Sequence, residues 1–81
     1  MARKVILAET FSAELKRCRV KLRLTQQALA DATGIPLSNI KAWEQGKQMP
    51  NYVNWELLYN YFKCKYIAKD LEVAYLREKG Q

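Results

Sequence analysis

Residues 24–47 read LTQQALADATGIPLSNIKAWEQGK and predict two short amphipathic helices joined by a tight turn. Thr25 is a good N-cap for the first helix, because its hydroxyl can accept a hydrogen bond from an otherwise unpaired backbone N–H in the first turn. Leu29 and Ala32 then place an apolar stripe along this helix. The segment therefore begins with a helix that has one face to bury.

The turn that follows is set by a glycine and a proline. Gly34 can take the left-handed conformation that ends a helix. Pro36 fits the first positions of the next helix and discourages Ile35 from staying helical. The connection between the two helices is therefore short.

The second helix of the pair is expected from Leu37 to Glu44, with Ile40 and Trp43 facing the interior. Its other faces carry Ser38, Asn39, Lys41, Ala42 and Gln45. Gly46 closes the helix. Two helices that meet steeply across a glycine turn of about three or four residues form the geometry in which the second helix can lie in the DNA major groove.

The residues of this region follow the order L-T-Q-x-x-L-A-x-x-x-G-I-x-x-x-x-I-x-x-W-E-x-G-K-x-x-P from Leu24 to Pro50. This pattern resembles the Cro/repressor (Xre-like, lambda-repressor-like) DNA-binding domain, and residues 11–63 fit the four leading helices of that family. The resemblance implies an all-α fold, a compact bundle of about five helices that contains a helix-turn-helix.

The remaining helices are predicted from their apolar spacing. Thr10 or Ser12 can cap a first helix that runs to about Arg23. The apolar face of that helix comprises Phe11, Leu15, Cys18 and Leu22. Members of the family often carry glycine where this chain has Arg23, so we expect the end of the first helix to be capped differently.

After Pro50, Asn51 is a plausible N-cap for a fourth helix, and residues 63–65 look like a corner before a fifth helix over residues 66–79. The apolar face of the fourth helix comprises Tyr52, Trp55, Leu58, Tyr59 and Phe62; that of the fifth comprises Ile67, Leu71, Ala74 and Tyr75 or Val73. The expected organisation is therefore a basic arm or short strand over residues 1–9, a helix-turn-helix domain over 10–63, and a C-terminal helix over 64–81 that can serve dimerisation.

The chain has 81 residues, which suits one small domain, and 14 Lys and Arg against eight acids give it a net charge of +6. A basic balance favours a polyanion as partner, although charge alone is equally compatible with a role in solubility. Five cations crowd the first helix, namely Lys16, Arg17, Arg19, Lys21 and Arg23. Such a density is typical of a surface that faces phosphates.

Several other classes of protein are disfavoured. No apolar run approaches the roughly 20 residues that span a bilayer, and residues 5–8 are too short for the core of a signal peptide, so a cytoplasmic protein without membrane contact is expected. Cys18 and Cys64 lack metal spacing in a chain without histidine, and we expect both to be buried, reduced thiols. No metal site, cofactor, small-molecule substrate or enzyme activity is predicted.

The DNA contacts implied by the resemblance fall into three groups. Leu37, Ser38, Lys41 and Ala42 would face base edges: Ser38 as donor or acceptor, Lys41 as donor to guanine, and Leu37 and Ala42 against thymine methyls. Backbone contacts would come from Gln26, Asn39, Gln45, Lys47, Gln48, Asn51, Arg17 and Arg23, with Gln26 also bracing the recognition helix. Arg3 and Lys4 can form an arm in the minor groove, or residues 4–7 can pair as a strand in a dimer.

The function implied is that of a sequence-specific regulator of transcription, a small Cro-like repressor of a phage or prophage that binds a palindromic operator in double-stranded DNA as a homodimer. The fifth helix is the candidate dimer interface, and its packing onto its own core is the alternative. Two other functions stay open. One is an antitoxin-like autoregulator, and the other is an adaptor that uses the same helices on a polymerase or another protein.

Overall fold

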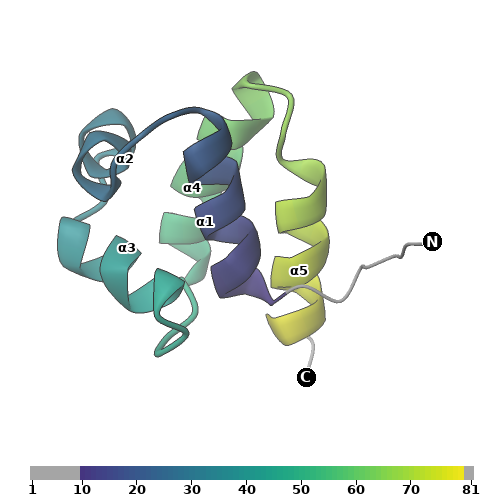
Figure 1. Ribbon diagram of the computed structural model, residues 1–81. Coiled ribbons are helices and arrows are strands. Elements are labelled where there is room, and N and C mark those ends of the chain that lie inside the picture. The colour runs from purple at the N-terminus through teal and green to yellow at the C-terminus, as the bar shows by residue number, and fades with distance from the viewer. Residues whose placement is uncertain (1–9, 80–81) are drawn as a thin grey trace.

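The computed structural model describes residues 10–79 and contains five helices within that range. They are α1 (Phe11–Lys21), α2 (Gln26–Thr33), α3 (Leu37–Glu44), α4 (Tyr52–Cys64) and α5 (Lys69–Lys79). In Figure 1, α2 and α3 form one side of the bundle, α1 and α5 lie next to each other on the other side, and α4 lies behind α1. No strand occurs between residues 10 and 79, so the expected all-α bundle is confirmed.

Three of the helices begin at the side-chain caps that the sequence predicts. The hydroxyl of Thr10 accepts a hydrogen bond from the Ala13 N–H at 3.2 Å, and the hydroxyl of Thr25 accepts one from the Ala28 N–H at 3.0 Å. Asn51 caps α4 in the same way through its carboxamide oxygen, which lies 2.9 Å from the Asn54 nitrogen. Each cap satisfies a backbone donor that the first turn leaves unpaired.

The helix ends differ from expectation at two positions. Gly34 and Gly46 end α2 and α3 in the left-handed conformation, as predicted, but Arg23 (φ 61°) and Tyr66 (φ 63°) adopt it as well. At Arg23 the backbone forms the same paired bonds that a glycine would allow, from the Arg23 N–H to the Val20 carbonyl at 2.8 Å and from the Leu24 N–H to the Arg19 carbonyl at 3.1 Å. The expected different cap is therefore wrong, because arginine itself takes the glycine conformation.

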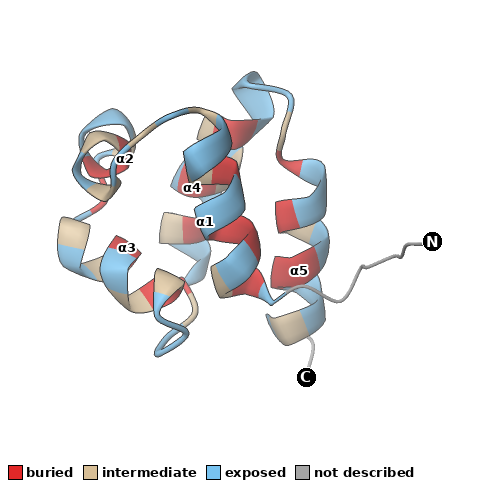
Figure 2. Ribbon diagram, viewed as in Figure 1, coloured by how far each residue is buried: buried red, intermediate tan, exposed pale blue. Residues whose placement is uncertain are grey.

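The core lies where the inner sides of all five helices meet, as the red segments of Figure 2 show. Its fully buried large side chains include Phe11, Leu15, Leu29, Ile35, Ile40, Leu58, Phe62 and Leu71. Two assignments to apolar faces are wrong. Ala32 is exposed and Ala30 is buried in its place, while Tyr52 is 66% exposed and donates its hydroxyl hydrogen bond to Glu56.

The fifth helix begins at Lys69 rather than residue 66, because the left-handed Tyr66 follows the end of the preceding helix and the next two residues are not helical. It packs back on its own core. The Tyr75 ring stacks on the Trp55 ring, with centroids 4.0 Å apart and planes at 5°, and the Glu78 carboxylate accepts a hydrogen bond from the Phe11 N–H at 2.5 Å. One face of α5 is thus an integral part of the fold, and Val73 and Leu76 on the rest of it are exposed.

The two cysteines lie in different environments. Cys18 is buried and its thiol donates to the Ile67 carbonyl at 3.5 Å, whereas Cys64 is exposed. The prediction of a buried thiol is therefore confirmed at Cys18 and wrong at Cys64, which lies in the last turn of α4 on the side away from the core. Burial raises the pKa of the Cys18 thiol from 9.0 to about 11.

Replacing Arg23 with glycine is expected to raise the free energy of unfolding by about 1 kcal/mol, because glycine adopts a positive φ without the steric cost that a side chain brings. Urea denaturation of Arg23→Gly measures the change. The reciprocal control is Gly34→Ala, where an added Cβ meets no atom within 4 Å, so that a loss of stability reports backbone strain alone. Equal stability of Arg23→Gly and the natural chain would contradict the left-handed assignment.

In the native state only Cys64 should react with iodoacetamide at pH 8, and both thiols should react in urea, as mass spectrometry of the alkylated chain would show. The raised pKa of Cys18 also makes the free energy of unfolding depend on pH. The contribution of the neutral Cys18 thiol to this free energy is complete below the ordinary thiol pKa. This contribution falls as the pH rises from 9.0 to about 11, because the unfolded thiol ionises first. Cys64→Ser should abolish native labelling, and labelling of Cys18 in that variant at pH 8 would refute its burial.

Candidate nucleic-acid interface

The helix α3 is anchored by its inner face and leaves a polar stripe on its outer face. Ile40 is fully buried and Trp43 is 2% exposed, as predicted. Ser38, Lys41 and Gln45 are exposed and recur at steps of three and four residues, so they share one side of the helix. An eight-residue helix held in this way presents a short row of hydrogen-bonding groups to a partner.

The apolar members of the predicted base-contact set lie deeper than the polar ones. Leu37 is half-buried and packs against the core, and Ala42 and Asn39 are also half-buried. The structure therefore brings Ser38 and Lys41 together with Gln45 on the outer surface, with Leu37 and Ala42 at its borders. Contact of any of these side chains with a base remains a prediction.

A buried ion pair orients α3 against α1. Arg19 binds Glu44 with two hydrogen bonds, from Nε at 2.7 Å and from Nη2 at 3.0 Å, and the two side chains are only 12% and 5% exposed. The remaining Nη1 donates to the Leu24 carbonyl at 2.8 Å, in the loop before α2. The hydrogen bond to Glu44 raises the pKa of the Arg19 guanidinium above its ordinary value, so Arg19 stays charged throughout the range in which the protein is folded.

Gln26 completes this arrangement from α2. Its side-chain nitrogen donates to the Glu44 carboxylate at 3.1 Å, so residues of three helices converge on one acid. Gln26 thereby braces α3, as the resemblance implies, and the amide nitrogen carries a second hydrogen that is suited to a phosphate. Sequence reasoning missed the role of Glu44 and counted Arg19 among the surface cations, although a lone acid directly after a buried tryptophan was a signal for a buried partner.

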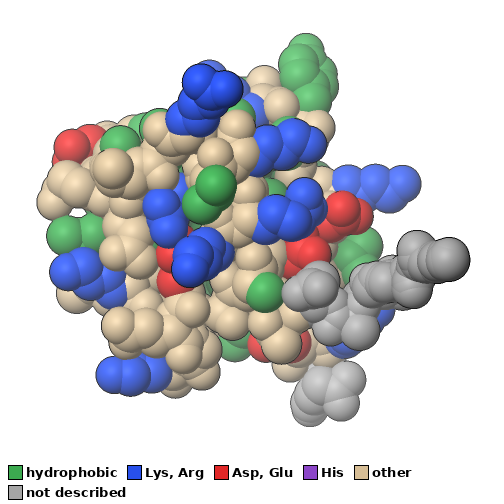
Figure 3. Space-filling view, in the orientation of Figure 1, with side chains coloured by type: hydrophobic (Ala, Val, Ile, Leu, Met, Phe, Trp, Pro, Cys, Tyr) green, Lys and Arg blue, Asp and Glu red, His purple; other side chains and the backbone are tan. Residues whose placement is uncertain are grey.

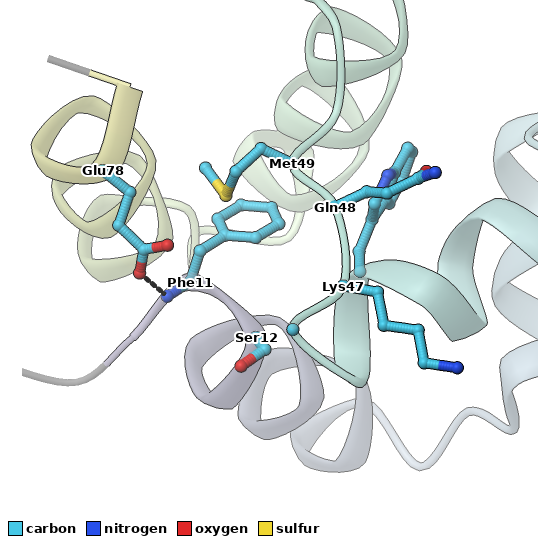
Figure 4. A pocket seen from close by; sticks show the side chains of 8 residues that line it. Phe11, Ser12, Lys47, Gln48, Met49 and Glu78 are labelled. Carbon is cyan, nitrogen blue, oxygen red and sulfur yellow. Dashed lines mark hydrogen bonds between the residues drawn. The ribbon is translucent and has the colours of Figure 1, made fainter. Parts of the chain in front are cut away.

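The loop after α3 carries the next group of predicted backbone contacts. Lys47 and Gln48 are exposed, and Figure 4 shows both side chains extending away from Phe11 and Glu78. Residues of this loop, of the first turn of α1 and of the end of α5 border a hollow of about 220 Å³. Asn51 uses its oxygen as the α4 cap, which leaves its NH₂ group as a donor toward a phosphate.

The predicted cations of the first helix are divided between structural pairs and the open surface. Arg17 makes hydrogen bonds to Glu14 at 2.9 and 2.8 Å and an ion pair with Asp70 of α5 at 3.2 Å, so it lies on the side of α1 away from α3. Arg23 is exposed at the corner before α2. Figure 3 shows Lys and Arg side chains spread over this face of the molecule, with acidic side chains beside several of them. Arg3 and Lys4 lie outside the described residues.

Two further findings concern the described part of the chain. None of its helices combines the length and apolar character that a bilayer crossing requires. Within residues 10–79 no group of three His, Cys, Asp or Glu side chains could hold a metal ion.

Glu44→Gln should lower the free energy of unfolding by about 3 kcal/mol, because it leaves the largely buried Arg19 guanidinium without a neutralising charge. Asp31→Asn is the matched control. It makes the same chemical change on an exposed carboxylate that accepts a hydrogen bond from Gln27, so its expected cost is about 0.5 kcal/mol or less. Denaturant titrations measure the loss of stability in both variants. Equal losses would show that the buried pair of Arg19 and Glu44 contributes no more than an exposed carboxylate.

Comparison with known proteins agrees with this geometry. A family model described as "Helix-turn-helix" matches residues 15–66, which include α2, α3 and most of the helices that pack on them. A segment of 42 residues, 52% of the chain, is 45% identical to an uncharacterized HTH-type transcriptional regulator, YqaE, of Bacillus subtilis (strain 168) and covers 36% of that protein. No solved structure gives a significant match. The matched model covers more than half of the chain, which therefore belongs to the Cro/C1-type (Xre-like) helix-turn-helix family.

Proposed function

We propose that the chain is a DNA-binding regulator of transcription that reads a site in duplex DNA through α3. The observation that carries this proposal is the exposed stripe of Ser38, Lys41 and Gln45 on a helix whose opposite face is anchored by Trp43 and Glu44. A rigid helix with an outward row of donors meets the requirement for reading base edges in the major groove. Membership of the helix-turn-helix family supports the same function, as does the similarity to the Bacillus subtilis protein, whose name describes an HTH-type transcriptional regulator.

The residues around the stripe suit a division of work between base and backbone contacts. Ser38 and Lys41 would contact base edges, with Leu37 and Ala42 against thymine methyl groups at the borders of the stripe. Phosphates beyond the end of α3 would be bound by Lys47, Gln48 and Asn51. The rest of the proposed set of phosphate and groove contacts comprises Gln26, Asn39, Gln45, Arg17, Arg23 and the arm residues Arg3 and Lys4. Arg17 would have to leave or share its ion pairs to do so, which makes it the weakest member.

The finer proposal is a small Cro-like repressor of a phage or prophage that occupies a palindromic operator as a homodimer. One eight-residue helix spans only a few base pairs, so two copies related by a two-fold axis give a longer site. Val73 and Leu76 on the exposed side of α5 supply apolar surface for such an association. The proposal assigns the protein no catalytic step.

Selection of bound sequences from a random duplex pool, at two salt concentrations, tests this function. A palindromic motif and a steep fall of affinity with salt are expected, because released counterions supply much of the binding energy. Enrichment of a single half-site would contradict the dimer. Binding without enrichment, or no binding, would contradict the proposal and favour an adaptor function or an antitoxin-like partnership with another protein.

Lys41→Glu should abolish the enrichment and weaken binding to the selected site by about 1–3 kcal/mol more than a charge change elsewhere, because it removes a base-edge donor. Lys63→Glu, at an exposed position on α4, alters the net charge by the same amount and controls for the loss of general attraction to phosphates. Fluorescence anisotropy with the selected duplex measures both affinities. Equal losses in the two variants would remove Lys41 from the interface.

A further inference from the structure

The corner between α4 and α5 displays a tyrosine in a conformation that suits glycine. Tyr66 has φ 63° and is 95% exposed, so its ring gains almost no packing from the rest of the protein. The left-handed conformation is costly for a residue with a large side chain, and only surrounding structure or function maintains it. The fold itself has no use for an aromatic ring at this position.

Tyr66 borders a basic hollow on the seam between α1 and α5. The hollow has a volume of about 180 Å³ and is lined by Arg17, Lys21, Tyr66, Ile67, Lys69 and Asp70. Arg17 and Asp70 neutralise each other across the seam at 3.2 Å. Within residues 10–79 neither Lys21 nor Lys69 has an acidic group at ion-pair distance, so two exposed ammonium groups border a partly apolar surface.

This seam hollow lies on the flank of α1 opposite α3 and shares only Arg17 with the proposed DNA contacts. Arg17 points from α1 toward Asp70 of α5, whereas Arg19 points from the same helix toward Glu44 of α3. The two arginines thus mark opposite flanks of α1, with the seam hollow on one and the recognition helix on the other. The charges of Lys21 and Lys69 are therefore not accounted for by contacts that α3 would make.

We propose that the seam hollow binds an acidic segment of a partner protein, with carboxylates on Lys21 and Lys69 and an apolar side chain between Tyr66 and Ile67. Charge complementarity selects the acidic groups, and the aromatic ring with the half-buried Ile67 selects the apolar one. A peptide fits better than a nucleic-acid backbone, because the half-buried Ile67 offers apolar surface that a peptide side chain can cover and a sugar-phosphate backbone cannot. The exposed side chain of Tyr66 is then available for contact with the partner.

The probe is a short acidic peptide, acetyl-Asp-Asp-Leu-Asp-Asp-amide, titrated into the ¹⁵N-labelled chain and followed by NMR. Saturable shifts are expected at Lys21 and at residues 66–70. The double variant Lys21→Glu with Lys69→Glu should weaken binding about tenfold, because each reversal replaces an attraction by a repulsion, and Lys63→Glu should not. No saturable shift, or shifts centred on α3, would overturn the proposal.

Tyr66→Gly provides the second variant, and it is expected to raise stability while it lowers affinity for the peptide severalfold. Arg23→Gly relieves the same strain at the other left-handed residue, so it should raise stability without altering peptide affinity. If Tyr66→Gly bound the peptide with the affinity of the wild-type chain, the Tyr66 ring would have no part in binding and the proposed contact would be wrong. A titration with duplex DNA tests the alternative ligand. If the duplex shifts the NMR signals of the seam residues, and the double variant loses affinity for DNA but not for the peptide, then the surface binds nucleic acid and the proposal is wrong.

Discussion

The paired hydrogen bonds between Arg19 and Glu44 join the first and third helices at the C-terminal end of the third. Gln26 and the Leu24 carbonyl bind the same two side chains, so the orientation of all three helices depends on one buried pair of charges. Removing two charges from water costs several kcal/mol, and the attraction between them roughly offsets that cost. The value of the pair thus lies in fixing one orientation of an eight-residue helix that is too short to be stable alone.

Interactions between near neighbours in the chain were predictable, and those between distant residues were not. Thr25 and Asn51 cap helices through bonds to the residue three positions on, and Gly34 ends a helix by its own conformation, so each leaves a local signal. Arg19 and Glu44 are 25 residues apart, and Arg17 and Asp70 are 53 apart. Composition shows that such charges exist but not which of them meet, so the density of cations in the first helix predicts a phosphate-facing surface and does not reveal the two ion pairs.

The errors in burial have two geometric origins. Each residue turns a helix by about 100°, so Ala32, two positions after the buried Ala30, points to solvent. Tyr52 and Cys64 are the first and last residues of α4, and the end turns of that helix reach solvent at both positions. The ends of helices were harder to predict than burial, because Arg23 and Tyr66 adopt the left-handed conformation that a glycine in the sequence would have indicated. The backbone bonds that close the two helices outweigh the strain at these residues.

The first helix shows how one sequence segment serves several purposes at once. Phe11, Leu15 and Cys18 bury one face, Arg19 fixes the third helix on one flank, and Arg17 fixes the fifth helix on the other. Ion pairs thus occupy two of its four cations, and the charge that remains for a partner lies on Lys16 and Lys21 and on Arg23 at the corner that follows the helix. These three side chains are spread over the exposed side of the helix and that corner, so the net charge of +6 does not act as a single DNA-binding surface. Under the two proposals this small basic domain presents separate faces to a nucleic acid and to a protein, and ion pairs to Glu44 of α3 and Asp70 of α5 hold the helix between them.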